Sequence, residues 1–184
     1  NLDELPDLVD FAAARGFHCS FVPVAIAPSA AGGDGFAAYA PELALGPGER
    51  ARVRDVYDRL IALKRRGAPI ANSSRFLRDS AQHLQDGTSP WSCDAGRLYV
   101  SVSPEGRVSV CHQYPAFARF DDPDLLARMR SAESRRRAAT QRAACAGCMR
   151  PCWAEVTHVF RNPRAALEAI ATVRPWRGRG GEGR

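Results

Sequence analysis

The sequence predicts an α/β segment followed by a smaller α+β segment. In the N-terminal half, amphipathic helical patterns alternate with short apolar runs, an order typical of a parallel sheet. Two such runs are too few to close a barrel or to form a doubly wound sheet, so we expect the first strands of a larger α/β unit to lie upstream. After "GTSPWSC" the pattern changes to a hairpin, a long helix and closely spaced cysteines.

The first helix is predicted from Leu2, because apolar residues recur at helical spacing and Gly16 then suits a helix end. Residues 18–27, "HCSFVPVAIA", form an apolar run typical of a strand buried on both faces. Cys19 in this run is expected to be a packed core thiol. Residues 27–48 are rich in Ala, Gly and Pro and are predicted to be a long loop.

A second helix is predicted over residues 49–66, which carry apolar side chains along one side. It closes with three cations followed by Gly67, the residues that favour a helix C-terminus. Residues 68–70, "API", suit a brief strand. Ser73 or Ser74 is then expected to cap a third helix.

Residues 97–110, "RLYVSVSPEGRVSV", predict a β-hairpin. If Ser103 opposes Arg107, the three-residue loop 104–106 places Gly106 where a left-handed backbone is needed. This register puts five apolar residues on one face of the hairpin: Leu98, Val100, Val102, Val108 and Val110.

A long helix is predicted over residues 122–142, with the carboxylates of "DDPD" at its N-terminus, where negative charge is favourable. The charged run 134–137 is expected to be a solvated face. After the cysteine group, Asn162 and Pro163 are predicted to open a short final helix.

Three of the six cysteines lie within the eight residues "CAGCMRPC": Cys145, Cys148 and Cys152. A two-residue gap lets successive thiolates face one site from a single turn of backbone, as zinc and iron–sulfur sites require. Structural disulfides are not expected, because the composition is not that of a small secreted scaffold.

Two further cysteines are predicted to meet at the hairpin. The pairing places Cys111 opposite Tyr99, on the face away from the valines, and the turn 94–96 folds Cys93 back beside Cys111. Two pairs of thiolates predict a metal site. The expected ligands of either zinc or an iron–sulfur cluster are Cys93, Cys111, Cys145 and Cys148. Cys152 or His158 is an alternative ligand. His112 and His158 are expected to be surface or neighbouring residues rather than ligands.

Half of the formal net charge of +6 lies near the C-terminus, because residues 174–184 hold four Arg against one Glu. This Gly- and Arg-rich tail is predicted to be disordered and solvated, so nucleic acid is not an expected partner. No apolar run of membrane-spanning length and no N-terminal targeting signal occurs, so no membrane contact and a cytoplasmic location are expected. The sequence contains no phosphate-binding glycine loop, nucleophile elbow or evident carboxylate pair.

The run from Cys93 to Cys111 has twelve residues before Gly106 and four after it. With the following helix and Cys-x2-Cys, it resembles the auxiliary-cluster domain of radical S-adenosylmethionine enzymes, of the SPASM or shorter twitch type. The upstream runs "LDELPDLVDFAAARGF", "VPVAI" and "GAPIANSSRFL" are similar to the last strands and helices of their partial TIM barrel. The resemblance implies a barrel portion over residues 1–88 and a cluster domain over residues 89–173.

The resemblance also implies an auxiliary [4Fe–4S] cluster that serves substrate binding or electron transfer. Its ligands would be Cys93, Cys111, Cys145 and Cys148, with Cys152 as an alternative or spare. Residues expected beside it are Tyr99, His112 and Trp153. A zinc-stabilised binding module without catalysis, built on the same thiolates, is the alternative.

One departure from the family is large. The Cys-x3-Cys-x2-Cys motif of the cluster that cleaves S-adenosylmethionine is absent. This chain alone is therefore not expected to start the radical reaction, and S-adenosylmethionine and a second [4Fe–4S] cluster are expected only in a full-length parent. Expected partners are the missing N-terminal radical S-adenosylmethionine half, an electron donor or acceptor protein, and a peptide or small-molecule substrate. An inactive or split remnant is a further alternative.

Overall fold

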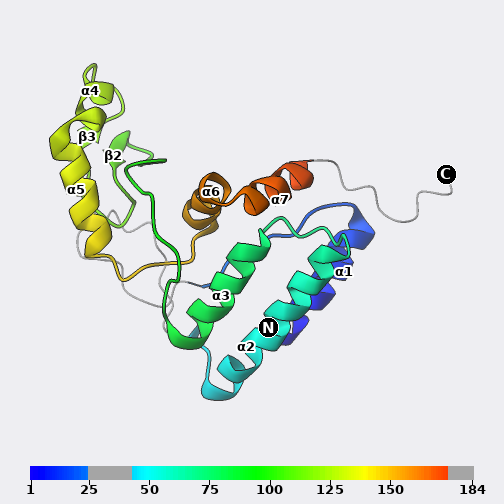
Figure 1. The fold of residues 1–184 in the computed structure, drawn as a ribbon. Coiled ribbons are helices and arrows are strands. Elements are labelled where there is room, and N and C mark those ends of the chain that lie inside the picture. Colours follow the sequence, from blue (N-terminus) through cyan, green and yellow to red (C-terminus); the bar gives the residue numbers. More distant parts are fainter. Residues whose placement is uncertain (25–42, 174–184) are drawn as a thin grey trace. The chain divides into compact units, whose positions relative to one another are not determined.

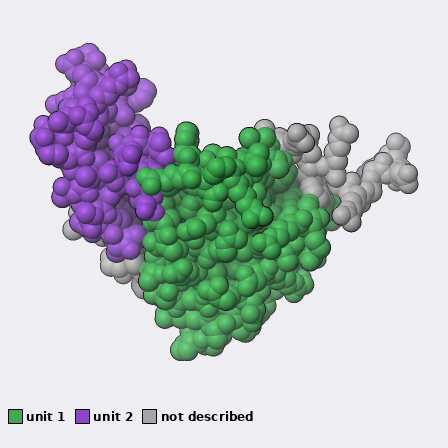
Figure 2. Space-filling model, in the orientation of Figure 1, with its two compact units in different colours: residues 1–23, 45–91, 149–184 green, residues 24–44, 92–148 purple. Residues whose placement is uncertain are grey.

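The computed structural model describes residues 1–24 and 43–173, which belong to two compact units (Figure 2). Unit 1 comprises residues 1–23, 45–91 and 149–184, and unit 2 comprises residues 24–44 and 92–148. The prediction placed residues 149–173 in the second domain, whereas they belong to unit 1. Most of the predicted long loop and the whole predicted tail lie outside the described residues. No helix in the described ranges is long and apolar enough to cross a lipid bilayer.

Unit 1 is mainly helical. Helix α2 lies between α1 and α3, and α6 and α7 follow each other near the C-terminal end (Figure 1). The bounds are η1 Leu2–Glu4, α1 Leu5–Arg15, α2 Pro47–Arg65, α3 Ser74–Asp86, α6 Pro151–Arg161 and α7 Pro163–Val173. The first three predicted helices and α7 are confirmed within a few residues. Helix α6 was missed, because it begins at Pro151 inside the cysteine group.

The predicted ends of these helices follow simple backbone chemistry. Gly16 and Gly67 adopt positive φ angles of 77° and 91°, which glycine reaches without a Cβ clash. Ser73 caps α3, since its hydroxyl accepts the Phe76 N–H at 3.1 Å. The core of unit 1 consists of apolar side chains from η1, α1, α2, α3 and the two bridging segments: Leu2, Val9, Phe21, Val53, Tyr57, Leu60, Ile61, Ile70, Leu77 and Ala81.

Among the described residues, neither predicted segment of unit 1 forms a strand, and the two segments meet only in an isolated parallel bridge between Cys19 and Ile70. The Asn72 side chain extends this pairing, because its amide accepts the Phe21 N–H at 2.6 Å and donates to the Phe21 carbonyl at 3.2 Å. The prediction of a strand buried on both faces is wrong at Val22, whose side chain is 60% exposed. The described part of this segment has only one bridged neighbour, so it is not a central strand of a sheet.

Two carboxylates from the C-terminal helices bind the N-terminus of α3. Glu155 of α6 accepts the Ser73 N–H at 2.8 Å, and Glu168 of α7 accepts the Ser74 N–H at 2.6 Å. Negative charge at a helix N-terminus is favourable, because unpaired N–H groups and the helix dipole both point there. These contacts attach α6 and α7 to the helical core of unit 1.

Tyr57 on α2 predicts a loss of stability at alkaline pH. Burial raises its pKa from the ordinary value of 10.0 to about 12. Between these values the unfolded chain releases the phenol proton and the folded chain retains it, so the free energy of unfolding falls as pH rises. A shift of two units corresponds to about 3 kcal/mol.

The measurement is urea unfolding at pH 9 and pH 11 for the parent and a Tyr57→Phe variant. The parent should lose about 1.4 kcal/mol more than the variant over this interval, since one unit of pKa shift is worth that much. Equal losses of unfolding free energy in the two proteins would contradict the raised pKa of Tyr57.

Unit 2 contains a three-stranded antiparallel sheet in the order β1–β2–β3. Its strands are β1 Ser101–Val102, β2 Arg107–Ser109 and β3 Ala118–Arg119. The predicted hairpin register is confirmed, since Val102 pairs with Val108 and Gly106 turns the loop at φ 75°. The prediction that the hairpin has one apolar face is only partly right. Val108 is fully buried, whereas Val102 is 47% exposed. Strand β3 was not predicted, and its pairing makes β2 the central strand.

The predicted long helix is two helices, α4 Leu125–Arg130 and α5 Ala132–Ala143. Ser131 between them has an extended backbone, with φ −64° and ψ 154°. Its hydroxyl accepts the Ser134 N–H at 3.1 Å and so caps a new helix. The single-helix prediction is therefore wrong because a serine cap competes with helix continuation.

Candidate metal centre

Cys93 lies at the start of a tight turn in unit 2. The Asp94 carbonyl accepts the N–H groups of Arg97 and Leu98, and Gly96 donates to the Tyr99 carbonyl at 2.7 Å. The Cys93 sulfur accepts the Ala95 N–H at 3.4 Å. The Tyr99 hydroxyl lies 3.4 Å from the same sulfur. The turn thus surrounds one thiol with two hydrogen-bonding groups.

Gly96 lets this turn approach α5 closely. Its φ is 76°, and a Cβ at this position would lie 2.7 Å from the Ala138 Cβ and 3.2 Å from a Val110 methyl. Only glycine fits both the backbone angle and the available space. Ala138 and Val110 are buried and, with Ala95, form the core of unit 2.

Cys111 follows β2 and lies against the same core as Cys93. Both thiols pack on Ala95, Val110 and Ala138. The Tyr114 N–H donates to the Cys111 carbonyl at 2.9 Å, which folds the chain into a turn after the thiol. His112 places its Nδ1 atom 3.7 Å from the Cys111 sulfur.

Two long-range hydrogen bonds attach both cysteine turns to the C-terminal end of α5. Arg142 donates to the Ala95 carbonyl at 2.7 Å, and the Tyr114 hydroxyl donates to the Gln141 carbonyl at 2.6 Å. Cys145 lies two residues after the end of α5 at Ala143. Cys93, Cys111 and Cys145 therefore come from three separate segments to one end of α5.

The charges of these three thiols affect the pKa of the Tyr114 hydroxyl. Burial is the largest cause that raises its pKa to about 12, and the charge of Cys145 and a hydrogen bond to Cys145 come next. The charges of Cys111 and Cys93 act in the same direction. A thiolate opposes a second negative charge on the hydroxyl, so each of them raises this pKa.

The Cys-Ala-Gly-Cys segment forms a second turn in which a backbone N–H donates to a cysteine sulfur. The Gly147 N–H donates to the Cys145 sulfur at 3.4 Å, and Gly147 has φ 92°. Cys148 is half-buried at the end of unit 2. Cys152 belongs to unit 1, where it is the exposed second residue of α6. Backbone N–H groups therefore point at two of the five candidate sulfurs.

All six cysteines lie within the described ranges and are free thiols. Cys19 packs against the core of unit 1, where its thiol donates to the Pro69 carbonyl at 3.5 Å and burial raises its pKa. His158 and Trp153 are buried in unit 1, and His158 pairs with Asp79 at 3.3 Å. Across residues 1–24 and 43–173, no three His, Cys, Asp or Glu side chains are grouped as one metal ion would require. Coordination by the five candidate cysteines stays a prediction.

No protein-family model, curated protein or solved structure matches this chain. The fold and the arrangement of thiols are therefore the basis for a functional assignment.

Sequence reasoning missed three residues that build the candidate site: Gly96, Tyr114 and Arg142. Gly96 was treated only as a turn residue, whereas its contact with Ala138 spans more than forty residues. Tyr114 and Arg142 each bind a backbone carbonyl of a distant segment. No local pattern encodes such contacts, because they depend on how α5 packs on the cysteine turns.

Proposed function

We propose that unit 2 binds a [4Fe–4S] cluster through Cys93, Cys111, Cys145 and Cys148. The observation that carries the proposal is that the segments of Cys93, Cys111 and Cys145 meet at the C-terminal end of α5, through the bonds from Arg142 to Ala95 and from Tyr114 to Gln141. Thiolates are soft ligands that select iron–sulfur clusters, zinc or Cu(I). A donor set made only of cysteines suits a cluster with four thiolate ligands.

The local hydrogen bonds fit the charged form of these ligands. The Ala95 N–H points at the Cys93 sulfur, and the Gly147 N–H points at the Cys145 sulfur. A hydrogen bond donated to a thiolate stabilises its charge and favours deprotonation. Such bonds also tune the reduction potential of a bound cluster. The two turns therefore supply both ligands and groups that support them.

Within the proposal, the chain is the C-terminal part of a radical S-adenosylmethionine enzyme, and the missing half cleaves S-adenosylmethionine. When bound, the auxiliary cluster would supply one-electron transfer or a Lewis-acidic iron for the substrate. The residues of this chain hold the thiolates, donate hydrogen bonds to them and shield them with the unit 2 core. Reduced thiols suit a reducing compartment such as the cytoplasm.

The direct test is metal and acid-labile sulfide analysis of the chain prepared without oxygen, together with its visible absorption spectrum. We expect iron and sulfide in equal amounts and a broad thiolate-to-iron absorption. Stoichiometric zinc in a colourless protein, even after attempted iron–sulfur reconstitution, would replace the proposal with a structural zinc module. Absence of both metals would overturn either form of the site.

A further inference from the structure

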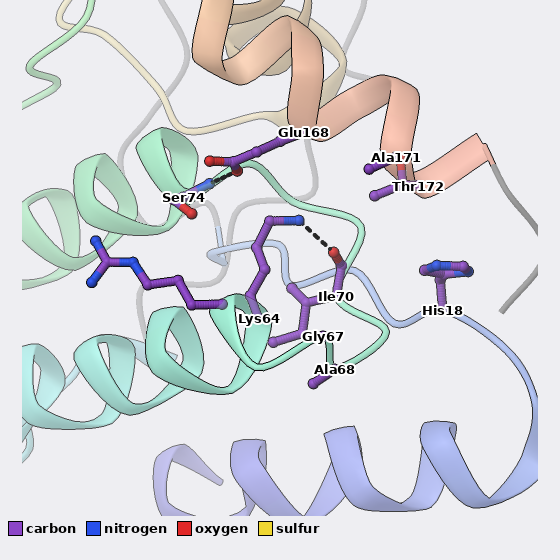
Figure 3. A pocket seen from close by; sticks show the side chains of 10 residues that line it. His18, Lys64, Gly67, Ala68, Ile70, Ser74, Glu168, Ala171 and Thr172 are labelled. Atoms are coloured by element: carbon purple, nitrogen blue, oxygen red, sulfur yellow. Dashed lines mark hydrogen bonds between the residues drawn. The ribbon is translucent and has the colours of Figure 1, made fainter. Parts of the chain in front are cut away.

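A cavity of about 290 Å³ lies in unit 1, whereas all but one of the candidate thiol ligands belong to unit 2. Its walls come from the C-terminal end of α2, the segment that follows it, and α7 (Figure 3). The lining includes His18, Lys64, Ile70, Ser74, Glu168 and Thr172. Small-molecule pockets start at about 300 Å³, so this cavity suits a compact metabolite.

Lys64 is the unusual residue of this cavity. The chain has 26 Lys and Arg residues, and Lys64 is the one lysine among them. Its side chain is half-buried and its Nζ atom donates to the Ile70 carbonyl at 2.8 Å. Figure 3 shows this amine between Ile70 and Glu168. In a sequence that otherwise uses only arginine as its cationic residue, a lysine lines the cavity.

Arginine and lysine differ chemically at such a position. Arginine remains charged at any physiological pH, whereas a lysine amine loses its proton when burial makes the charge costly. Burial lowers the pKa of Lys64 against the opposing effect of Glu168 and Glu155. Neutral amines are nucleophiles for carbonyl carbon. A hydrogen bond to a carbonyl alone does not require lysine, since arginine also donates one.

We propose that this cavity binds a small aldehyde or ketone and that Lys64 forms a Schiff base with its carbonyl carbon. The neutral nitrogen of Lys64 attacks that carbon, and the carbonyl oxygen takes one proton from this nitrogen and one from solvent and leaves as water. The product is a protonated carbon–nitrogen double bond with the same charge as the ammonium it replaces. No oxidant or reductant is consumed, and hydrolysis reverses the reaction.

The surroundings of Lys64 suit this product. A protonated Schiff base keeps one N–H, so the bond to the Ile70 carbonyl remains available. The carboxylates of Glu168 and Glu155 already act on the Lys64 charge and would offset that of the product. The Ser74 N–H fixes the Glu168 carboxylate at 2.6 Å, so this counter-charge is held in place.

The residues that line the cavity also restrict which carbonyl compound it can bind. Ala68, Ile70 and Ala171 supply apolar surface, which suits a short aliphatic substituent on the carbonyl compound. The test therefore uses butanal with cyanoborohydride, which reduces a Schiff base to a stable secondary amine. Peptide mapping by mass spectrometry then locates the butyl group. Because Lys64 is the sole lysine, only its amine and the α-amino group of Asn1 can be labelled.

We expect Lys64 in the folded chain to be labelled several-fold faster at pH 7 than Lys64 in the urea-unfolded chain. A Lys64→Arg variant, which keeps a cation and a donor for Ile70, should be labelled only at Asn1 while its circular dichroism is unchanged. Labelling of folded Lys64 at or below the unfolded rate would overturn the proposal.

A second pair of variants tests whether the cavity itself is the site. Ala171→Leu fills the lining on α7 and should slow the labelling of Lys64. Ala51→Leu makes the same change at an exposed position of α2 outside the lining and should leave the rate unchanged. Equal rates in Ala171→Leu and the parent would show that Lys64 reacts from open solvent, and the proposed site would fall.

Discussion

A Cys93→Ala, Cys111→Ala double variant is expected to contain no iron and no acid-labile sulfide after preparation without oxygen. The two thiols supply half of the four proposed ligands, and both pack on the same three core residues. Removing two of four thiolates leaves too few ligands for a cuboidal cluster. The visible absorption of the parent protein should disappear with the metal.

Two single variants serve as controls for this result. Cys19→Ala removes a thiol from the core of unit 1 and should retain the iron of the parent. Cys152→Ala removes an exposed thiol outside unit 2 and should also retain iron if Cys148 is the fourth ligand. Iron in the double variant would exclude the proposed ligand set. Complete loss of iron in Cys152→Ala would assign Cys152, rather than Cys148, to the site.

Gly96→Ala is expected to destabilise unit 2 by about 3 kcal/mol. A non-glycine residue with a left-handed backbone costs roughly 1–2 kcal/mol, and overpacking of a filled core costs typically 1–3 kcal/mol. Both costs apply, since φ is 76° and the new Cβ would lie 2.7 Å from the Ala138 Cβ. Hydrogen exchange of the buried Val108 amide in β2 measures the effect, because its protection reports opening of unit 2.

Gly106→Ala is the matched control. Gly106 has nearly the same φ, 75°, but a Cβ there would meet its nearest neighbour only at 3.9 Å. This variant should therefore cost about 1 kcal/mol, the backbone contribution alone. The Gly96 variant should also bind less iron, because the strained turn carries Cys93. Equal protection of Val108 in the two variants would show that the contact with Ala138 is not a constraint.

The sequence predicted best those features that local chemistry determines. The helix ends at Gly16 and Gly67, the cap at Ser73 and the hairpin turn at Gly106 each follow from one residue and its immediate neighbours. The hairpin register follows from the length of its loop. Such features need no knowledge of distant contacts.

Features that depend on tertiary packing were predicted poorly. Val22 and Val102 look like core residues by type, but neither is covered by a packed layer. The break at Ser131 reflects competition between a cap and helix continuation, which periodicity does not resolve. For the candidate site, residue type and spacing indicated the cysteines. Tyr114 and Arg142 emerge only once α5 is placed against the turns.

The attachment of α6 and α7 to α3 has a consequence for the order of folding. Glu155 and Glu168 reach the N-terminus of α3 across sequence separations of 82 and 94 residues. The two segments of unit 2 lie between the three segments of unit 1 in the chain, so all of unit 2 is synthesised before unit 1 can be completed. Until α6 and α7 have been synthesised, the first turn of α3 lacks the carboxylates of Glu155 and Glu168. A chain released before that point would have an incomplete unit 1.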